Sequence, residues 1–340
     1  MPELMCCISN NKKPKISTPK RLINAMRKSF FHHYGPQGQA NDHNKDERYY
    51  YLDNNNSNLI DFNYKFASYL AGLIEGDGTI IVPTTERSSK GRLNYPSIQI
   101  VFDLRDFPLA LIIQKELEHG SISRKKGINA YILTINNYSG ILQVVSLING
   151  YMRTPKIFAL YKLIDWLNER LNIHLDKKEI DSSSINSNSW LAGFIDADGH
   201  FSVRATTVSR YPKIECKFEL SQRQFDHNNR SNLSFFNLIA DFLYTCVKPI
   251  RVTKPKPEFR LRTTSLKGNL ALVNYLNIYP LWSSKYLNYK DWLKVLTYFE
   301  KKEHKIPEKI EAILNIKYGM NDKRTYFNWD HLGKFYNVHK

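Results

Sequence analysis

The chain has 340 residues, 42% of them hydrophobic, so it can bury one large core or two ordinary ones, and global disorder is excluded. Lys and Arg outnumber Asp and Glu by 49 to 32, and the formal net charge of +17 favours a nucleic-acid partner over an acidic lipid surface or a merely basic protein. Apolar runs are shorter than the roughly 20 residues of a membrane span, and the four cysteines form neither a disulfide framework nor a zinc motif, which predicts a soluble intracellular protein with reduced thiols.

Residues 1–64 are basic at first and then polar, and few of their apolar positions repeat at a helical or strand period. This pattern predicts a flexible N-terminal tail. The segment KKPKISTPKRLINAMRK is poor in acidic residues, as a mitochondrial presequence is, and a disordered basic arm is the alternative.

After the tail, one pattern occurs twice. LAGLIEGDGTI begins at Leu70 and LAGFIDADGHF at Leu191, with six of the eleven positions identical. After the first copy we expect strands at 79–82 and 96–103, a helix at 108–117, a hairpin at 121–135 and a helix at 154–167. After the second copy the corresponding segments are 200–206, 213–222, 233–244, 248–264 and 283–296.

Each half is therefore predicted to have the order α-β-β-α-β-β-α, in an α+β protein of two pseudo-symmetric lobes. The predicted first lobe spans 65–175 and the second 189–305. The polar, turn-rich residues 176–188 are the predicted linker, and residues 306–340 are a C-terminal extension without an assigned role.

The repeated motif has the apolar spacing of a helix. Leu70, Leu73 and Ile74 share one helix face, and the small residues Ala71 and Gly72 would let another backbone approach closely. Two such helices, one from each half, could pack tightly against each other.

Each motif helix is expected to end at an Asp-Gly pair, with Gly78 and Gly199 as left-handed helix caps. On its own such a pair could be only a turn. In both halves, however, an Asp lies at the negative end of the helix dipole, where its charge is unfavourable. If the helices pack side by side, Asp77 and Asp198 come together and require cations, for which the hard ion Mg²⁺ is suited. Such a site on a basic protein indicates metal-assisted phosphodiester cleavage.

The sequences LAGLIEGDG and LAGFIDADG resemble the signature of the LAGLIDADG homing endonucleases, many of which are encoded in organelle introns. The resemblance covers about residues 65–300. It implies a monomeric, site-specific double-strand DNA endonuclease with saddle-shaped antiparallel sheets and the two motif helices at the lobe interface. It also implies Asp77 and Asp198 as metal ligands, the carbonyls of Gly76 and Ala197 as accessory ligands, and Mg²⁺ as the cofactor, with Mn²⁺ able to substitute.

Glu75 and Asp196, two residues before the motif aspartates, are expected to have structural roles.

Further catalytic positions follow from the resemblance alone. The strand KFELSQR matches the one that supplies a Gln near the metal, which makes Gln222 a candidate, and IVFDLRD offers Asp103 at the matching place in the first half. The turns TPK and SSK match the positions of a basic residue, so Lys156 and Lys285 are candidates, with Arg153 as an alternative to Lys156.

The resemblance also implies that the sheets read the DNA major groove. In FSVRAT and EFRLRTT the apolar and polar residues alternate, which places the DNA-contact candidates Arg204, Arg260 and Arg262 on the outward face, where Arg204 and Arg262 could contact guanine. The hairpin residues expected to hold phosphates are Arg124, Lys125, Lys126, Lys254 and Lys256. Because the two halves differ at most of these positions, we expect a non-palindromic site about two helical turns long.

Two other functions fit the fold. Some members of the family act as RNA maturases that assist a group I intron in splicing, with or without nuclease activity, and a catalytically silent DNA-binding regulator is the third possibility. The presence of both Asp77 and Asp198 favours the nuclease. The resemblance and the N-terminal segment together predict a mitochondrial location, without a membrane partner or an obligate protein partner.

Overall fold

Two lobes with the same order of elements make up the residues that the computed structural model describes, 57–206 and 213–336. Most of the predicted tail lies outside these residues, as do Cys6, Cys7 and the candidate presequence. The first helix of the described residues begins at Ser57, within the segment predicted as tail and before the predicted lobe boundary at residue 65.

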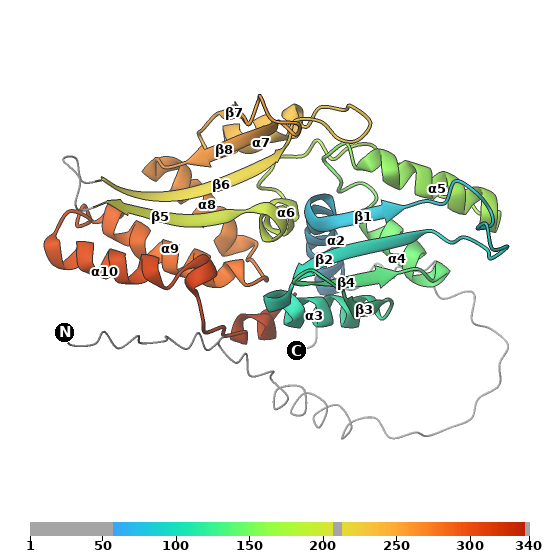
Figure 1. The fold of residues 1–340 in the computed structure, drawn as a ribbon, viewed down its shortest axis with the longest axis horizontal. Helices are drawn as coiled ribbons and strands as arrows, with labels where there is room; N and C mark the ends of the chain where they lie inside the picture. Colours follow the sequence, from blue (N-terminus) through green and yellow to red (C-terminus); the bar gives the residue numbers. More distant parts are fainter. Residues whose placement is uncertain (1–56, 207–212, 337–340) are drawn as a thin grey trace, which may run out of the picture. The chain divides into compact units, whose positions relative to one another are not determined.

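The first lobe consists of the helices and strands from Ser57 to Leu171 (Figure 1). They are α2 (Ser57–Asp77), β1 (Gly78–Ile81), β2 (Ser97–Asp103), the short helix η1 (Leu104–Asp106), α3 (Phe107–Leu117), β3 (Ser121–Arg124), β4 (Ala130–Ile135), α4 (Tyr138–Ile148) and α5 (Ile157–Leu171).

The second lobe repeats this order and then continues into the C-terminal extension. Its elements are α6 (Trp190–Asp198), β5 (His200–Thr206), β6 (Lys213–Arg223), α7 (Leu233–Phe242), β7 (Val247–Ile250), β8 (Glu258–Thr263), α8 (Leu266–Ile278) and α9 (Lys285–Glu300). The extension contains α10 (Pro307–Tyr318), η2 (Asn321–Lys323) and η3 (Asp330–Lys334).

The α+β class is confirmed, but the predicted element order lacks one helix in each half. The helices α4 and α8 follow the fourth strand of their lobes, so each half reads α-β-β-α-β-β-α-α. The missed helix α4 has its buried residues Ile141, Val144, Val145 and Ile148 at helical spacing, a signal that was present in the sequence.

Each lobe contains one four-stranded antiparallel sheet. The strand order is β1-β2-β4-β3 in the first lobe and β5-β6-β8-β7 in the second. Along β1, β2, β5 and most of β6, buried residues alternate with more exposed ones; in β5, for example, Phe201, Val203 and Ala205 are buried while Arg204 is exposed. The sheets therefore bury one face against helices and leave the other face accessible.

The lobes meet where α2 and α6 pack side by side, between the two sheets (Figure 1). A Cβ on Gly72 would lie 2.0 Å from the carbonyl oxygen of Trp190, and one on Gly193 would lie 2.0 Å from that of Tyr69. One hydrogen bond of 2.8 Å joins the Ser68 and Ser189 hydroxyls. The predicted close packing of the two motif helices is thus confirmed, and it depends on the absence of side chains at the two glycines.

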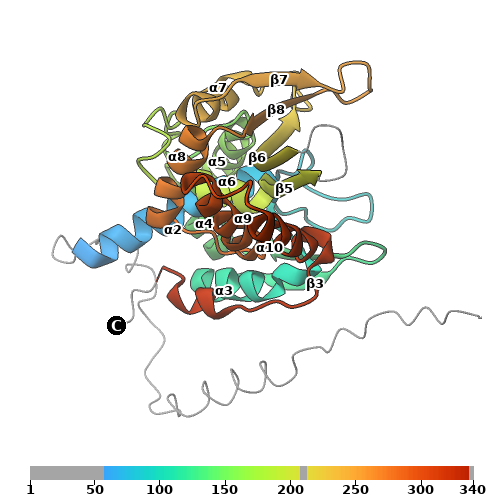
Figure 2. The ribbon, with the colours of Figure 1, turned by 90° about the vertical axis from the view of Figure 1, so that its left-hand side faces the viewer.

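The C-terminal extension covers the outer edge of the second sheet. Figure 2 shows α9 and α10 together on one side of the second lobe. The Lys317 amino group and the Asn321 amide donate hydrogen bonds of 3.1 and 3.0 Å to the carbonyls of Ala205 and Phe201, on the edge strand β5. Edge strands expose unpaired backbone groups, so the extension satisfies carbonyls that would otherwise be open.

The predicted linker at 176–188 lacks helix and strand, yet it is held firmly against the first lobe. The Arg153 guanidinium forms an ion pair of 2.6 Å with Asp181 and donates a hydrogen bond of 2.6 Å to the carbonyl of Ser183. Both charged side chains are at least nine-tenths buried.

No helix among the described residues is long and apolar enough to cross a membrane.

Candidate active site

The motif helices end next to each other. Asp77 is the last residue of α2 and Asp198 the last of α6. A Cβ on Gly76 would lie 2.2 Å from the Cβ of Ala197 and 2.9 Å from Oδ2 of Asp198. The structure therefore brings the two motif carboxylates to one place between the lobes, as the repeat predicts.

The electrostatics of this place are unfavourable for two negative charges. Burial and, after it, repulsion from the Asp198 carboxylate raise the pKa of Asp77 to about 7, although Lys285 and Lys156 lower it. Burial also raises the pKa of Asp198, against the two lysines and a hydrogen bond from Gln222. A cation bound between these carboxylates would favour the ionised form of both.

Each motif helix has a lysine at its C-terminal end. The Lys156 ammonium donates hydrogen bonds of 2.8, 2.7 and 2.7 Å to the carbonyls of Ile74, Glu75 and Gly78. Lys285 donates to the carbonyls of Ile195, at 3.4 Å, and Ala197. The two lysines thus occupy matching positions and complement the negative ends of the helix dipoles.

The two candidates for the basic residue of the first lobe make different contacts. Arg153 binds the linker, whereas Lys156 reaches the end of the motif helix. The carbonyl of Ala197, one of the two predicted accessory ligands, accepts a hydrogen bond from Lys285.

Gln222 lies at the predicted place, but its counterpart was assigned wrongly. The Gln222 amide donates a hydrogen bond to Oδ2 of Asp198. Thr79 pairs with Gln99 in the first sheet and His200 with Glu219 in the second, so this register makes Phe102 the equivalent of Gln222.

Asp103 is one residue further and points to the other face of the sheet, where it forms an ion pair of 2.8 Å with Arg105. Although burial acts in the opposite direction, the hydrogen bonds from Arg105 lower the pKa of Asp103.

The acidic residues two positions before the motif aspartates are buried hydrogen-bond acceptors, in agreement with the expected structural roles. Glu75 accepts from the amides of Arg153 and Thr154 and from the indole nitrogen of Trp190, at 2.6 Å. Its pKa is raised by burial, while these hydrogen bonds lower it.

Asp196 makes the matching contacts. It accepts hydrogen bonds from the Trp282 amide at 2.7 Å, from the Ser283 hydroxyl at 2.5 Å and from the Tyr69 hydroxyl at 2.8 Å. Burial raises its pKa to about 6. Since Tyr69 precedes the first motif and Trp190 the second, each lobe donates one hydrogen bond to the buried acid of the other.

The glycines that follow the motif aspartates are needed for space and not for a left-handed backbone. Gly199 has φ −71° and ψ 148°, and Gly78 is absent from the residues with positive φ. A Cβ on Gly78 would lie 2.7 Å from the Ile74 carbonyl oxygen, and one on Gly199 would lie 2.8 Å from that of Ile195. The predicted left-handed caps are therefore wrong, because the chain passes directly from helix into strand.

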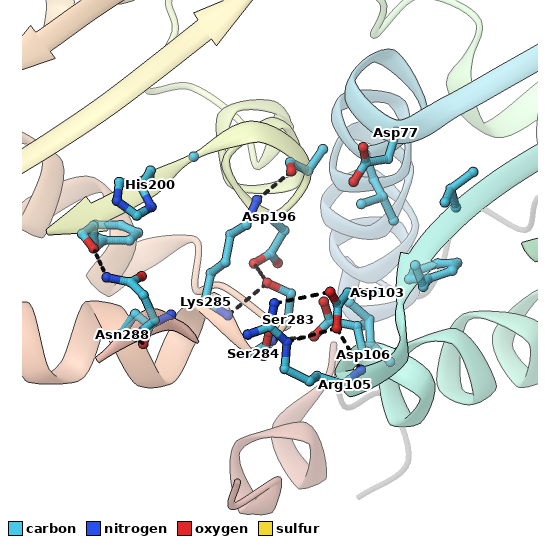
Figure 3. Close-up of a pocket in the computed structure, with 18 of the residues that line it drawn as sticks. Asp77, Asp103, Arg105, Asp106, Asp196, His200, Ser283, Ser284, Lys285 and Asn288 are labelled. Carbon is cyan, nitrogen blue, oxygen red and sulfur yellow. Dashed lines mark hydrogen bonds and ion pairs between the residues drawn. The ribbon is translucent and has the colours of Figure 1, made fainter. Parts of the chain in front are cut away.

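Two clefts flank the helix ends, each next to one of the lysines. One cleft, of about 320 Å³, is lined by Asp77, Lys285 and His200 (Figure 3). Another, of about 550 Å³, is lined by Lys156 and Gln222. The motif helices therefore have one cleft next to each lysine.

The first cleft contains residues that the sequence did not single out. Asp106 of the first lobe accepts a hydrogen bond of 2.6 Å from the amide of Ser284 in the second lobe, and burial raises its pKa. The pKa of His200, next to the motif Asp198, is lowered by burial. No local pattern identifies Asp106, because its partner is 178 residues away.

The residues predicted to contact DNA lie on accessible surfaces. Arg204, Arg260 and Arg262 are on the outward face of the second sheet, where they form ion pairs with Glu215 or Glu219. The hairpin residues are exposed in the turns β3–β4 and β7–β8; they are Arg124, Lys125, Lys126, Lys254 and Lys256.

Comparison with known proteins gives a consistent result. The family model described as LAGLIDADG endonuclease matches residues 70–167 and 191–296. The chain is 31% identical over 329 residues to Intron-encoded DNA endonuclease aI3 of Saccharomyces cerevisiae, with 84% of this chain and 79% of that protein covered. Intron-encoded RNA maturase bI4 of the same yeast is 29% identical over 139 residues, which cover 41% of this chain and 19% of that protein.

A similar fold occurs in the crystal structure of the LAGLIDADG homing endonuclease I-GzeII in complex with its DNA target. The TM-score is 0.60 at 22% sequence identity, with 76% of this chain and 99% of that chain covered. This likeness agrees with the two-lobed arrangement described above.

Proposed function

This chain belongs to the LAGLIDADG endonuclease family, and from that membership we propose that it is a site-specific endonuclease that hydrolyses both strands of a long, asymmetric DNA site. The observation that carries the proposal is the meeting of Asp77 and Asp198 between two clefts, each next to one lysine. Two clefts related by the pseudo-symmetry of the lobes suit the cleavage of two strands.

The proposed cofactor is Mg²⁺, with Mn²⁺ able to substitute. The donors at the helix ends are carboxylate and carbonyl oxygens, which suit a hard cation, and the pKa of Asp77 is raised by burial and then by the neighbouring Asp198 carboxylate, so a cation there would favour ionisation. Asp77 and Asp198 would hold the metal, with the carbonyls of Gly76 and Ala197 as further donors. Among the described residues no group of three or more His, Cys, Asp or Glu side chains could hold a metal, so DNA and water would complete the coordination. When bound, the ion would activate water and stabilise the leaving oxygen.

The chain's own groups would position the reacting atoms. Gln222 fixes the Asp198 carboxylate through its hydrogen bond. Lys156 and Lys285 place positive charge at the helix ends, where the charge developing on a cleaved phosphate would be stabilised. Asp103, held by Arg105, lines the cleft that contains Asp77, and the equivalent residue of the second lobe is Arg223.

The DNA would lie along the outward faces of the sheets. The exposed hairpin lysines would bind phosphates, and the strand arginines Arg204, Arg260 and Arg262 would reach base edges. Since one chain contains both lobes, we expect a monomer. The basic N-terminal segment and the intron-encoded relatives support a mitochondrial location.

Cleavage of a randomised long-duplex library with Mg²⁺ tests this proposal. The wild-type protein should cut one asymmetric sequence in both strands, and Asp77→Asn and Asp198→Asn should lower the rate by on the order of 10²–10⁴ while binding persists. Asp176→Asn is the matched control, because this carboxylate is 83% exposed in the linker. Near-normal cleavage by Asp198→Asn would rule out the assigned site.

Assistance to a group I intron is the second candidate function. The similarity to Intron-encoded RNA maturase bI4 and the net charge of +17 support it. A folded protein that cleaves no library member with any divalent metal, yet binds intron RNA, would favour this function over the nuclease.

A further inference from the structure

The outward faces of the two sheets differ in charge. The first-lobe face includes the side chains that alternate away from the helices: Thr79, Ile81, Ser97, Gln99, Val101, Asp103, Ser121, Ser123, Ile132 and Thr134. Asp103, at the end of β2, is the one charged side chain of these ten, and none of them is basic. The corresponding second-lobe face includes Arg204, Lys213, Glu215, Lys217, Glu219, Arg223, Lys248, Glu258, Arg260 and Arg262. It presents seven basic side chains against three carboxylates.

Two equivalent outward pairs show the difference. Gln99 pairs with Thr134 in the first sheet, and Glu219 pairs with Arg262 at the equivalent place in the second. The next outward pair along the same strands is Val101 with Ile132 in the first sheet and Ser221 with Arg260 in the second. At three of these four positions the second lobe has an Arg or Glu where the first lobe has an uncharged residue, and at the fourth both lobes are uncharged.

In the second lobe one carboxylate organises the arginines. Oε1 of Glu219 lies 2.8 Å from Nε and 2.7 Å from Nη2 of Arg262, and 3.6 Å from Nη1 of Arg260. The Glu219 side chain is only 15% exposed, while that of Arg262 is 41% exposed. Arg262 is therefore held along one edge of its guanidinium, and the donors at the opposite end remain available to a ligand. Paired donors of this kind match O6 and N7 of guanine in the major groove.

In the first lobe the available chemistry is different. Val101 and Ile132 present methyl groups side by side, and apolar contact in the major groove selects the thymine methyl. Gln99, next to them, offers the amide donor and acceptor that pair with N6 and N7 of adenine. On this face no side chain can donate in a bidentate manner to guanine as Arg does.

We infer that the two lobes read opposite classes of base pair: the first-lobe face an A·T-rich half-site, and the second-lobe face a half-site with guanine opposite Arg260 and Arg262. Glu219 is the positioning residue that fixes Arg262 for this contact. The inference rests on the proposed function, because it requires both faces to lie in the major groove of one DNA site.

A binding selection from a randomised duplex library tests the inference. Full-length protein is used without divalent metal, so that the DNA is not cut. The same selection is run with Arg262→Gln and Glu219→Gln, and with Thr134→Val as the matched control at the equivalent position of the first lobe. The wild-type protein should enrich a site with one A·T-rich half and one guanine-containing half. Arg262→Gln should lower discrimination for guanine at one position by roughly 5- to 150-fold.

The two other variants separate positioning from general binding. Glu219→Gln should weaken discrimination at the same position as Arg262→Gln while leaving affinity for unrelated DNA equal or higher, since a negative charge facing DNA is removed. Thr134→Val should leave the guanine-containing half unchanged. Two halves of equal base composition, or an unchanged preference in Arg262→Gln, would overturn this inference alone. Enrichment of no sequence at all would overturn the proposed function and this inference with it.

Discussion

A single added carbon at the crossing of α2 and α6 should disrupt the lobe interface. In Gly193→Ala the new Cβ would lie 2.0 Å from the carbonyl oxygen of Tyr69 and 2.9 Å from the amide nitrogen of Leu73. Both contacts are with backbone atoms, so no side-chain rotation relieves them. Since Cβ atoms essentially never approach within 3.0 Å, the helices would have to separate by about 1 Å or more.

The expected cost follows from the rigidity of the two helices. Overpacking a core typically costs 1–3 kcal/mol, and a clash between backbones belongs at the upper end, about 3 kcal/mol. Because the entropy of unfolding grows with chain length, 1 kcal/mol corresponds to roughly 1.5 °C in a protein of this size, so the Tm should fall by about 4–5 °C. Separation of the helices would also displace Asp77 from Asp198, and cleavage should fall with stability.

Thermal denaturation followed by circular dichroism measures this effect. Gly333→Ala is the matched control, because no atom lies within 4 Å of its added Cβ and its backbone is not left-handed. The control should keep the wild-type Tm to within about 1–2 °C, as surface substitutions usually do. A Gly193→Ala protein as stable as Gly333→Ala would refute the close helix packing on which the site depends.

Three further predictions concern charge and hydrogen bonding at the interface. The pKa of Asp77 is raised from 3.8 to about 7 in the folded protein. This group therefore stabilises the metal-free fold below about pH 4, and that stabilisation is lost as the pH rises through 7. Mg²⁺ should therefore raise the Tm more at pH 8 than at pH 6, and equal rises would contradict this assignment. Lys285→Met removes a charge that lowers the pKa of Asp77, so the acidic limb of the cleavage pH profile should move to higher pH; an unmoved limb would argue against the contact. Trp190→Phe removes the donor of the 2.6 Å hydrogen bond to the buried Glu75 and should cost about 1–3 kcal/mol in urea denaturation, whereas a change below about 0.5 kcal/mol would show that water replaces the indole.

Much of the fold could be predicted because the motif occurs twice. One helix–strand pattern alone is ambiguous, but a second copy at a fixed distance defines the lobes, their interface and the meeting of Asp77 with Asp198. The alternation of Arg204, Arg260 and Arg262 with buried residues was likewise visible in the strands themselves.

Two features of the site could not be predicted from local sequence: the register of the first-lobe strand β2 and a contact between the lobes. Assigning Asp103 instead of Phe102 as the counterpart of Gln222 is a shift of one residue, which in a strand moves the side chain to the opposite face. Asp106 and its partner Ser284 belong to different lobes, so only the folded chain brings them together.

The buried carboxylates at the lobe interface have a consequence for exchanging halves between related proteins. The donor for Glu75 is Trp190 of the second half, and the donor for Asp196 is Tyr69 of the first, so each half carries one donor and one acceptor for the other. A hybrid made by replacing one half therefore inherits two unmatched pairs at once. Its stability should depend on whether the imported aromatic residue has a polar hydrogen that reaches the resident acid, because a buried carboxylate that loses one of its donors costs about 1–3 kcal/mol. Compatible halves for engineered chimaeras could be chosen by these two positions before any DNA-contacting residue is considered.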